Sequence, residues 1–254
     1  MELDKTMTES NLLAVFAHPD DESFRCGGTL ALLARRGVRV WVLCATRGEA
    51  GSRGDPPLCR PDELAQVRER ELRCACRALE IEPPRFLDYR DGDLGDVDEK
   101  EAVAQVMAAI RELHPQVLLT WPIDGLSGHP DHVAVSRWTT LAFKQAAALP
   151  SGPAALYHLA VPRSVAQALE LSHLHAVPDE QVTLIVDANP VWEQKLAAIR
   201  CHRTQMGGSP ILNAPEERQR LFLGTEHFRL AMTRPNLTTH TERNFFERLE
   251  ENNL

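Results

Sequence analysis

Continuous apolar runs alternate along the chain with segments of helical spacing. Residues 12–17 and 38–45 are apolar almost throughout, and between them residues 28–36 have the spacing of a helix that ends at Gly37. Apolar runs of this kind are typical of strands buried on both faces of a parallel sheet. The same pattern predicts further strands at 85–89, 117–121, 156–161, 182–186 and 226–232. It predicts further helices at 62–79, 98–113, 131–148, 190–203 and 216–223.

The order of these elements indicates the fold class. Strands and helices that alternate several times in succession favour right-handed crossovers and a parallel sheet. We therefore expect an α/β fold: a Rossmann-like, mostly parallel sheet with helices on both faces and a site at the carboxyl ends of its strands. No internal repeat or clear linker is visible, so one domain is expected over residues 1–254, with residues 1–10 as a loose leader.

Composition and charge restrict the class of partner. The chain has 254 residues, of which 43% are hydrophobic and 25% are charged, as in ordinary globular proteins. Its formal net charge of -8 and its pI near 5.7 argue against nucleic acids and anionic membranes as partners, because both select basic surfaces. Small molecules are therefore the expected partners.

The sequence also gives an expectation about the compartment. Residues 1–5 are acidic and no apolar signal segment follows them. No run approaches the roughly eighteen apolar residues of a membrane span. The cysteines are spread thinly along the chain, at Cys26, Cys44, Cys59, Cys74, Cys76 and Cys201. We expect reduced thiols in a cytoplasmic protein, without a zinc knuckle at the pair in 74–76.

Polar side chains gather where the predicted parallel strands end. His18, Asp20, Asp21 and Glu22 directly follow the first strand. The later strand ends carry Arg47, Glu49, Arg90, Asp91, Asp124, His129, Asp131 and His132. Ligands of open α/β sheets bind at this edge. Together the histidines and carboxylates can supply the three protein ligands of a catalytic zinc site and still leave an acid and a base for the chemistry.

Two of these segments resemble a known family. His18-Pro19-Asp20-Asp21-Glu22 and His129-Pro130-Asp131-His132 resemble the motifs of the PIG-L/LmbE family of zinc-dependent N-acetylglucosaminide deacetylases, which includes the deacetylases of mycothiol and bacillithiol synthesis. Residues 46–51 and 68–72 are similar to two further family segments. The resemblance covers residues 12–163, with a weaker echo at residues 202–205.

The resemblance implies a role for each matching residue. Three residues would bind the metal: His18, Asp21 and His132. Asp20 would be the general base that deprotonates the zinc-bound water. His129, oriented by Asp131, would stabilise the oxyanion and protonate the leaving amine. Three residues would lie at the sugar: Glu49, Arg68 and Asp91.

The expected function is that of a metal-dependent hydrolase that removes an acetyl group from an N-acetylglucosamine (GlcNAc) type sugar or glycoside, giving acetate and a free amine. Three alternatives stay open: the same site on another amide, such as a thiol-conjugate amidase; a sugar-binding relative without turnover; and Fe2+ in place of zinc, because two histidines and one carboxylate also describe a non-haem iron site. Relatives of this family form trimers or hexamers, so a homo-oligomer is a further expectation.

Simpler interpretations exist for several of these residues. Glu22 is also explained by the dipole of the helix that follows it. Arg68 is also explained as part of a solvated helix face, and Asp91 and Glu49 by turn chemistry. Ser127 stands where some family members have a tyrosine just before Gly-His-Pro-Asp-His, so the role of that tyrosine is not expected here. The sequence does not define the aglycone, but the region after Pro162 and the two long loops are expected to shape that part of the pocket.

Overall fold

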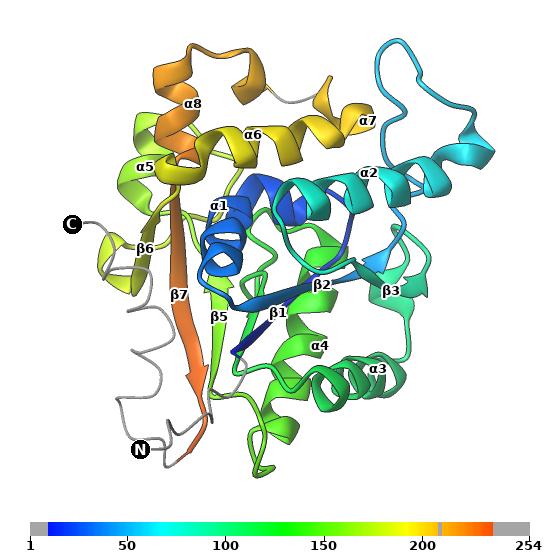
Figure 1. The fold of residues 1–254 in the computed structure, drawn as a ribbon, viewed down its shortest axis with the longest axis vertical. Helices are drawn as coiled ribbons and strands as arrows, with labels where there is room; N and C mark the ends of the chain where they lie inside the picture. The colour runs from blue at the N-terminus through cyan, green and yellow to red at the C-terminus, as the bar shows by residue number, and fades with distance from the viewer. Residues whose placement is uncertain (1–9, 208–209, 236–254) are drawn as a thin grey trace, which may run out of the picture.

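The computed structural model describes residues 10–207 and 210–235. Within them, a seven-stranded sheet has the order β3-β2-β1-β4-β5-β7-β6 (Figure 1). The strands are β1 (Asn11–Phe16), β2 (Arg39–Thr46), β3 (Arg85–Tyr89), β4 (Val117–Thr120), β5 (Ala155–Leu159), β6 (Leu184–Asp187) and β7 (Thr225–Thr233). The first five strands pair in parallel, and β7 runs antiparallel between β5 and β6. The predicted α/β fold is confirmed, while the expected leader lies outside the described residues except for Ser10.

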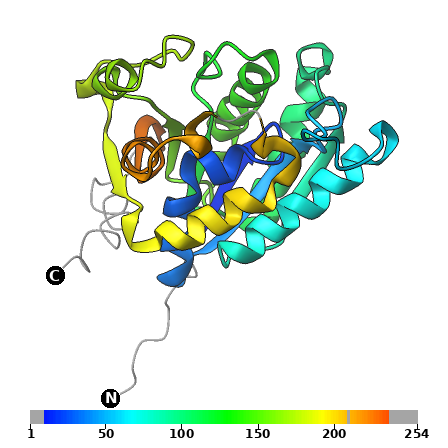
Figure 2. The ribbon, with the colours of Figure 1, turned by 90° about the horizontal axis from the view of Figure 1, so that it is seen from above.

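Helices cover both faces of the sheet. They are α1 (Asp21–Arg35), α2 (Leu64–Ala78), α3 (Glu99–Leu113), α4 (Pro130–Ala146), α5 (Arg163–Ala168), α6 (Trp192–Cys201), α7 (Arg203–Met206) and α8 (Glu216–Leu223). Figure 1 shows α1, α2 and α6 on one side of the sheet and α3 and α4 on the other. Seen from above, α2 and α6 lie side by side (Figure 2). Among the described helices, none has the length and apolar character needed to cross a bilayer.

The central strand β1 explains the apolar run near the start of the chain. Successive side chains of a strand point to opposite faces of the sheet. Accordingly, Leu12 and Phe16 pack with α1, whereas Leu13 and Val15 pack with α3 and α4. All four side chains are 0% exposed. Because both faces of β1 are covered, the strand needs apolar residues at every position and shows no alternation.

Helix α1 begins earlier than the sequence pattern predicts. The predicted start was Gly28, but the helix begins at Asp21, so the acidic motif forms its first turn. Gly28 lies inside the helix because another element approaches it closely: a Cβ atom there would lie 2.2 Å from the Cβ atom of Ala188. A glycine required for close packing therefore resembled a helix boundary in the sequence.

The cysteine prediction is wrong for one pair. Cys74 on α2 and Cys201 on α6 form a disulfide across a sequence separation of 127 residues. The two helices pack against each other, which places the Cα atoms 5.7 Å apart. Spacing along the chain cannot reveal such a pair, because its distance depends on helix packing. The free cysteines of the described residues are Cys26, Cys44, Cys59 and Cys76.

Candidate active site

Asp21 is fixed at the point where β1 ends and α1 begins. Its Oδ2 atom accepts hydrogen bonds from the backbone amides of Ala17 at 3.1 Å and His18 at 3.0 Å. The indole Nε1 of Trp121, directly after β4, donates to the same oxygen at 3.2 Å. The α1 dipole also favours a negative charge at this end of the helix. Asp21 therefore stays in place as a buried carboxylate whose other oxygen, Oδ1, faces His132.

His132, in the first turn of α4, presents a lone pair to Asp21. Its Nδ1 lies 3.2 Å from the carbonyl oxygen of Gly125, and a carbonyl can only accept, so the ring proton belongs on Nδ1. Burial lowers the pKa of His132, which favours the neutral ring. The unprotonated Nε2 of His132 then lies 3.6 Å from Oδ1 of Asp21, so two acceptor atoms face each other without a proton between them. A cation that binds both atoms fits this arrangement.

His18 completes a set of side chains that could hold a metal ion. One ligand atom from each of His18, Asp21 and His132 lies within 4.8 Å of the others. The Nε2 atom of His18 also lies 3.0 Å from Asp91 and 3.1 Å from Asp131. Burial lowers the pKa of His18, but these carboxylates outweigh burial and raise it to about 10. The same negative surroundings would stabilise a divalent cation, and two imidazoles with one carboxylate are a zinc donor set.

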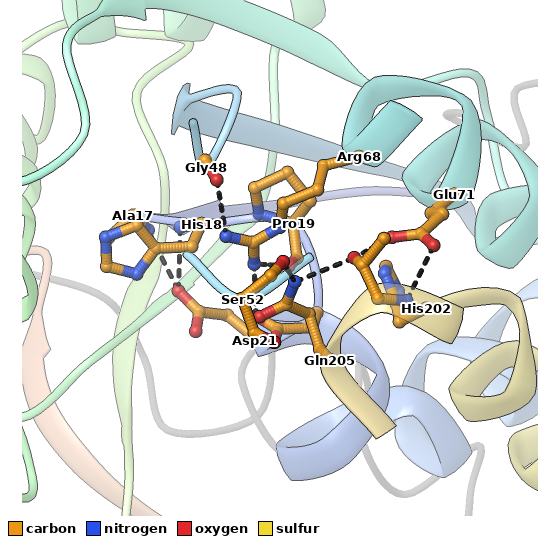
Figure 3. A network of polar contacts seen from close by, with 12 residues as sticks. Ala17, His18, Pro19, Asp21, Gly48, Ser52, Arg68, Glu71, His202 and Gln205 are labelled. Atoms are coloured by element: carbon orange, nitrogen blue, oxygen red, sulfur yellow. Dashed lines mark hydrogen bonds and ion pairs between the residues drawn. The ribbon is translucent and has the colours of Figure 1, made fainter. Parts of the chain in front are cut away.

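Asp20 lies beside this cluster in an unusual backbone conformation, with φ of 119°. Burial raises the pKa of its carboxyl group to about 6, although the nearby Arg68 lowers it. Nη2 of Arg68 lies 3.4 Å from Oδ1 of Asp20. The guanidinium also donates to the carbonyl oxygens of Gly48 and Pro19, at 2.9 and 2.5 Å (Figure 3). Arg68 is 3% exposed, so it is not the solvated helix residue of the simpler interpretation.

His129 and Asp131 lie at the start of α4. His129 is the N-cap residue, and its Nδ1 accepts the backbone amide of Asp131 at 3.2 Å. Its proton therefore belongs on Nε2, and the residue is exposed. The carboxylate of Asp131 accepts the amides of Gly92 at 2.8 Å and Leu94 at 3.3 Å in addition to contacting His18. Asp131 thus joins α4 to the loop after β3, and it contacts His129 through its backbone.

Glu49, in the loop after β2, and Asp91, in the loop after β3, each accept a backbone hydrogen bond from the other loop. Oε1 of Glu49 accepts the backbone amide of Asp91 at 3.0 Å, and Oδ2 of Asp91 accepts the amide of Ala50 at 3.0 Å. The loops after β2 and β3 are held together in this way. The structure therefore brings all nine predicted site residues to the carboxyl ends of β1 to β4, while Ser127 near them is exposed.

Two buried groups behind Asp20 were not assigned to the site from the sequence. Oε2 of Glu22 accepts the backbone amide of Asp20 at 3.1 Å, and its Oε1 lies 2.7 Å from Nε2 of His202. Both side chains are 0% exposed. Burial lowers the pKa of His202, but the Glu22 carboxylate outweighs it and raises the pKa above the ordinary value. The weaker similarity to the family at residues 202–205 was the one sequence signal of the contact between Glu22 and His202. Trp121, equally unassigned, stacks on His132 with ring centroids 3.9 Å apart.

Comparisons with known proteins agree with this geometry. Residues 13–143, more than half of the chain, match the family described as PIG-L, GlcNAc-PI de-N-acetylase. The chain is 35% identical to a 1D-myo-inositol 2-acetamido-2-deoxy-alpha-D-glucopyranoside deacetylase of Thermobispora bispora, over 90% of each protein.

Solved structures share the fold. The conserved protein TT1542 of Thermus thermophilus superposes with a TM-score of 0.64 at 27% identity, covering 90% of this chain and 97% of the other. The N,N'-diacetylchitobiose deacetylase of Pyrococcus horikoshii gives a TM-score of 0.67 at 21% identity, covering 92% and 89%. The resemblance seen in the two histidine motifs is confirmed: the chain belongs to the PIG-L family of de-N-acetylases.

Proposed function

We propose that this protein is a zinc-dependent N-deacetylase that hydrolyses the acetamide of a GlcNAc-type sugar or glycoside, giving acetate and a free amine. The observation that carries the proposal is the cluster of His18, Asp21 and His132 with Asp20 beside it. The activity named for the similar Thermobispora bispora protein, deacetylation of a GlcNAc glycoside of myo-inositol, supports the same reaction class.

His18, Asp21 and His132 would hold the metal ion. When bound, zinc supplies Lewis acidity to the acyl group and lowers the pKa of a water molecule. Fe2+ also accepts two histidines and one carboxylate. Elemental analysis of protein purified in air separates the two ions: we expect about one zinc per chain, and iron as the main metal would contradict the zinc assignment.

Asp20 would move the proton and His129 would stabilise the negative charge. Asp20 accepts the proton of the attacking water, and its pKa of about 6 suits a base that works near neutral pH. The same proton can then pass from Asp20 to the leaving amine. His129 carries its ring proton on Nε2 and is exposed, so it can donate a hydrogen bond to the oxyanion. Asp131 supports this role by fixing the other ring nitrogen through its amide.

The sugar would lie over the loops that follow β2 and β3. Glu49 and Asp91 in these loops, together with Arg68 on α2, are assigned to substrate binding. Oε2 of Glu49 has no hydrogen-bond partner within the described residues, which supports a contact with a sugar hydroxyl. Arg68 has a second task, because its bonds to the carbonyl groups of Gly48 and Pro19 hold the loops around Asp20.

The substitution Asp20→Ala tests the base. We expect the rate of acetate release from N-acetylglucosaminides to fall by a factor of about 10² to 10⁴, because the proton acceptor is lost. Circular dichroism should show that the fold is kept. Asp96→Asn, a change at an exposed carboxylate without an assigned role, is the matched control and should keep full activity. Activity of Asp20→Ala close to that of the unchanged protein would contradict the assignment.

A further inference from the structure

A pocket of about 900 Å³ opens beside Asp20 and extends away from the metal-ligating cluster. Its walls come from α1, from the segment after α5, and from α8 with the residues before it, together with Ser52 after β2 and Gln205 of α7. Figure 2 shows α8 next to α1. The apolar side chains of the wall are Phe24, Leu169, Leu171, Ile211 and Phe222. Pockets that bind small organic molecules have this size and this largely apolar lining. Because Asp20 is part of the wall, a sugar held at the cluster would place its aglycone in this pocket.

Arg25 gives the pocket a positive charge. Its guanidinium carbon lies 4.7 Å from the centroid of the Phe222 ring, and the residue is half-buried. In the part of the chain that the structure describes, no carboxylate lies within ion-pair distance of it. Burial lowers the pKa of Arg25 to about 10, although the Asp21 carboxylate one helical turn before it acts in the opposite direction. A half-buried cation of this kind favours an anionic partner.

The other charges of the wall do not cancel Arg25. Asp20 already has a cationic neighbour, because Nη2 of Arg68 lies 3.4 Å from its carboxylate. Glu170 is exposed, so water screens its charge. Arg218 adds a second cation and donates to the carbonyl oxygen of Leu169 at 3.0 Å. His173 also belongs to the wall.

Resting on the proposed deacetylase function, we infer that this pocket binds the aglycone and selects one with an apolar aromatic or alkyl body and an acidic group that contacts Arg25. The inference separates this chain from an enzyme for an inositol glycoside. A polyol has no charged group for Arg25 and little apolar surface for the leucine, isoleucine and phenylalanine side chains. Ser52, His173 and Gln205 of the wall can hydrogen-bond to its hydroxyl groups, but it gains less in this pocket than an acidic aromatic or alkyl aglycone.

A panel of N-acetylglucosaminides tests the inference. The methyl, phenyl, 4-carboxyphenyl and myo-inositol glycosides, each as both anomers, would be compared by kcat/KM for acetate release. We expect the phenyl glycoside to exceed the methyl glycoside by about tenfold, because it buries apolar area. The 4-carboxyphenyl glycoside should exceed the phenyl glycoside by about tenfold more, because it gains a charged hydrogen bond. Equal values across the panel, or the highest value for the inositol glycoside, would overturn the inference and leave the deacetylase function standing.

Failure of the proposed function gives a different result. If none of the glycosides releases acetate, the deacetylase assignment fails. The pocket is then tested by calorimetric titration with the corresponding free-amine glucosaminides. Tighter binding of the 4-carboxyphenyl compound than of the methyl compound would support the pocket chemistry, and equal binding would overturn it.

The variant Arg25→Gln tests the charge contact. We expect the ratio of kcat/KM for the 4-carboxyphenyl and phenyl glycosides to fall from about ten to about one. This ratio is taken within one protein, so a change in the folded fraction does not affect it. Arg35→Gln, at an exposed position in the last turn of the same helix, is the matched control and should keep the ratio of the unchanged protein. An unchanged ratio in Arg25→Gln would mean that Arg25 only packs on Phe222.

Discussion

Asp20 takes a backbone conformation, with φ of 119°, that residues other than glycine rarely adopt. Such strain persists only where neighbouring groups fix the chain. Glu22 does so: its carboxylate accepts the amide of Asp20, and its other oxygen is held by Ser23 and His202. The helix-dipole explanation of Glu22 is therefore incomplete. Its carboxylate accepts hydrogen bonds from three donors and fixes the backbone of the proposed base.

Glu22→Gln tests this role at almost unchanged side-chain volume. Three donors face the carboxylate, so the amide NH2 of glutamine must point at one of them and leave it without an acceptor. We expect kcat for acetate release to fall about tenfold while KM changes less than about twofold, because Asp20 loses its position and the sugar contacts remain. Steady-state kinetics measures this split. Glu193→Gln, exposed on α6, should change neither constant, and an unchanged kcat in Glu22→Gln would contradict the role.

For helices and strands, the hydrophobic pattern predicted the bounds of those elements whose ends depend on neighbouring residues in the sequence. The strand at 85–89 and the helix at 216–223 have the predicted bounds. The helix predicted over 190–203 instead stops at Cys201, and α7 starts at Arg203. His202 between them binds Glu22, which is 180 positions away in the sequence. A contact at that separation leaves no periodic signal, and the six residues of α5 are too few to show one.

The disulfide between α2 and α6 should stabilise the folded chain. It closes a loop with a sequence separation of 127 residues, and crosslinks of this kind restrict the unfolded chain most when the loop is long. For the double variant Cys74→Ala, Cys201→Ala we expect a loss of about 2–5 kcal/mol in the free energy of unfolding, measured by urea titration without reductant.

Two observations control this experiment. Cys59→Ala, which removes a free and partly exposed thiol, should leave the stability unchanged. Peptide mass mapping without reductant should recover residues 74 and 201 as a linked pair. If the reduced and oxidised forms of the unchanged protein unfold at the same urea concentration, the disulfide does not stabilise the fold.

For the molecule as a whole, the order of the sheet explains which parts of the site could be predicted. The strands β3, β2, β1 and β4 are neighbours and parallel, so the residues that follow them meet at one edge. Motifs after each strand were therefore sufficient to predict that the residues proposed for metal binding and catalysis meet there. The aglycone pocket could not be predicted in this way. Its wall combines α1 with Ser52, Gln205 and residues within 169–173 and 211–222, which lie far apart in the sequence and meet only through tertiary packing.

Metal binding should stabilise the whole fold, because the ligands lie far apart in the sequence and meet only in the folded chain. His18 and Asp21 follow β1, whereas His132 belongs to α4. A ligand at about 100 times its Kd adds about 2.7 kcal/mol to the free energy of unfolding. For a chain of this size that corresponds to a rise of about 5–10 °C in Tm. We expect this rise when zinc is added to protein treated with a chelator, measured by differential scanning fluorimetry.

The control for this measurement keeps the shape of the site and removes its charge. In Asp21→Asn the single amide oxygen keeps its hydrogen bonds to the amides of Ala17 and His18, which turns the NH2 group toward His132. An amide NH2 group does not bind a cation, so the rise in Tm caused by zinc should fall below about 2 °C. Asp96→Asn should show the full rise. Comparing the change on adding zinc, rather than Tm itself, removes the intrinsic effect of each substitution on stability. An equal rise in Asp21→Asn would mean that zinc binds elsewhere, and the proposed role of the cluster would then be wrong.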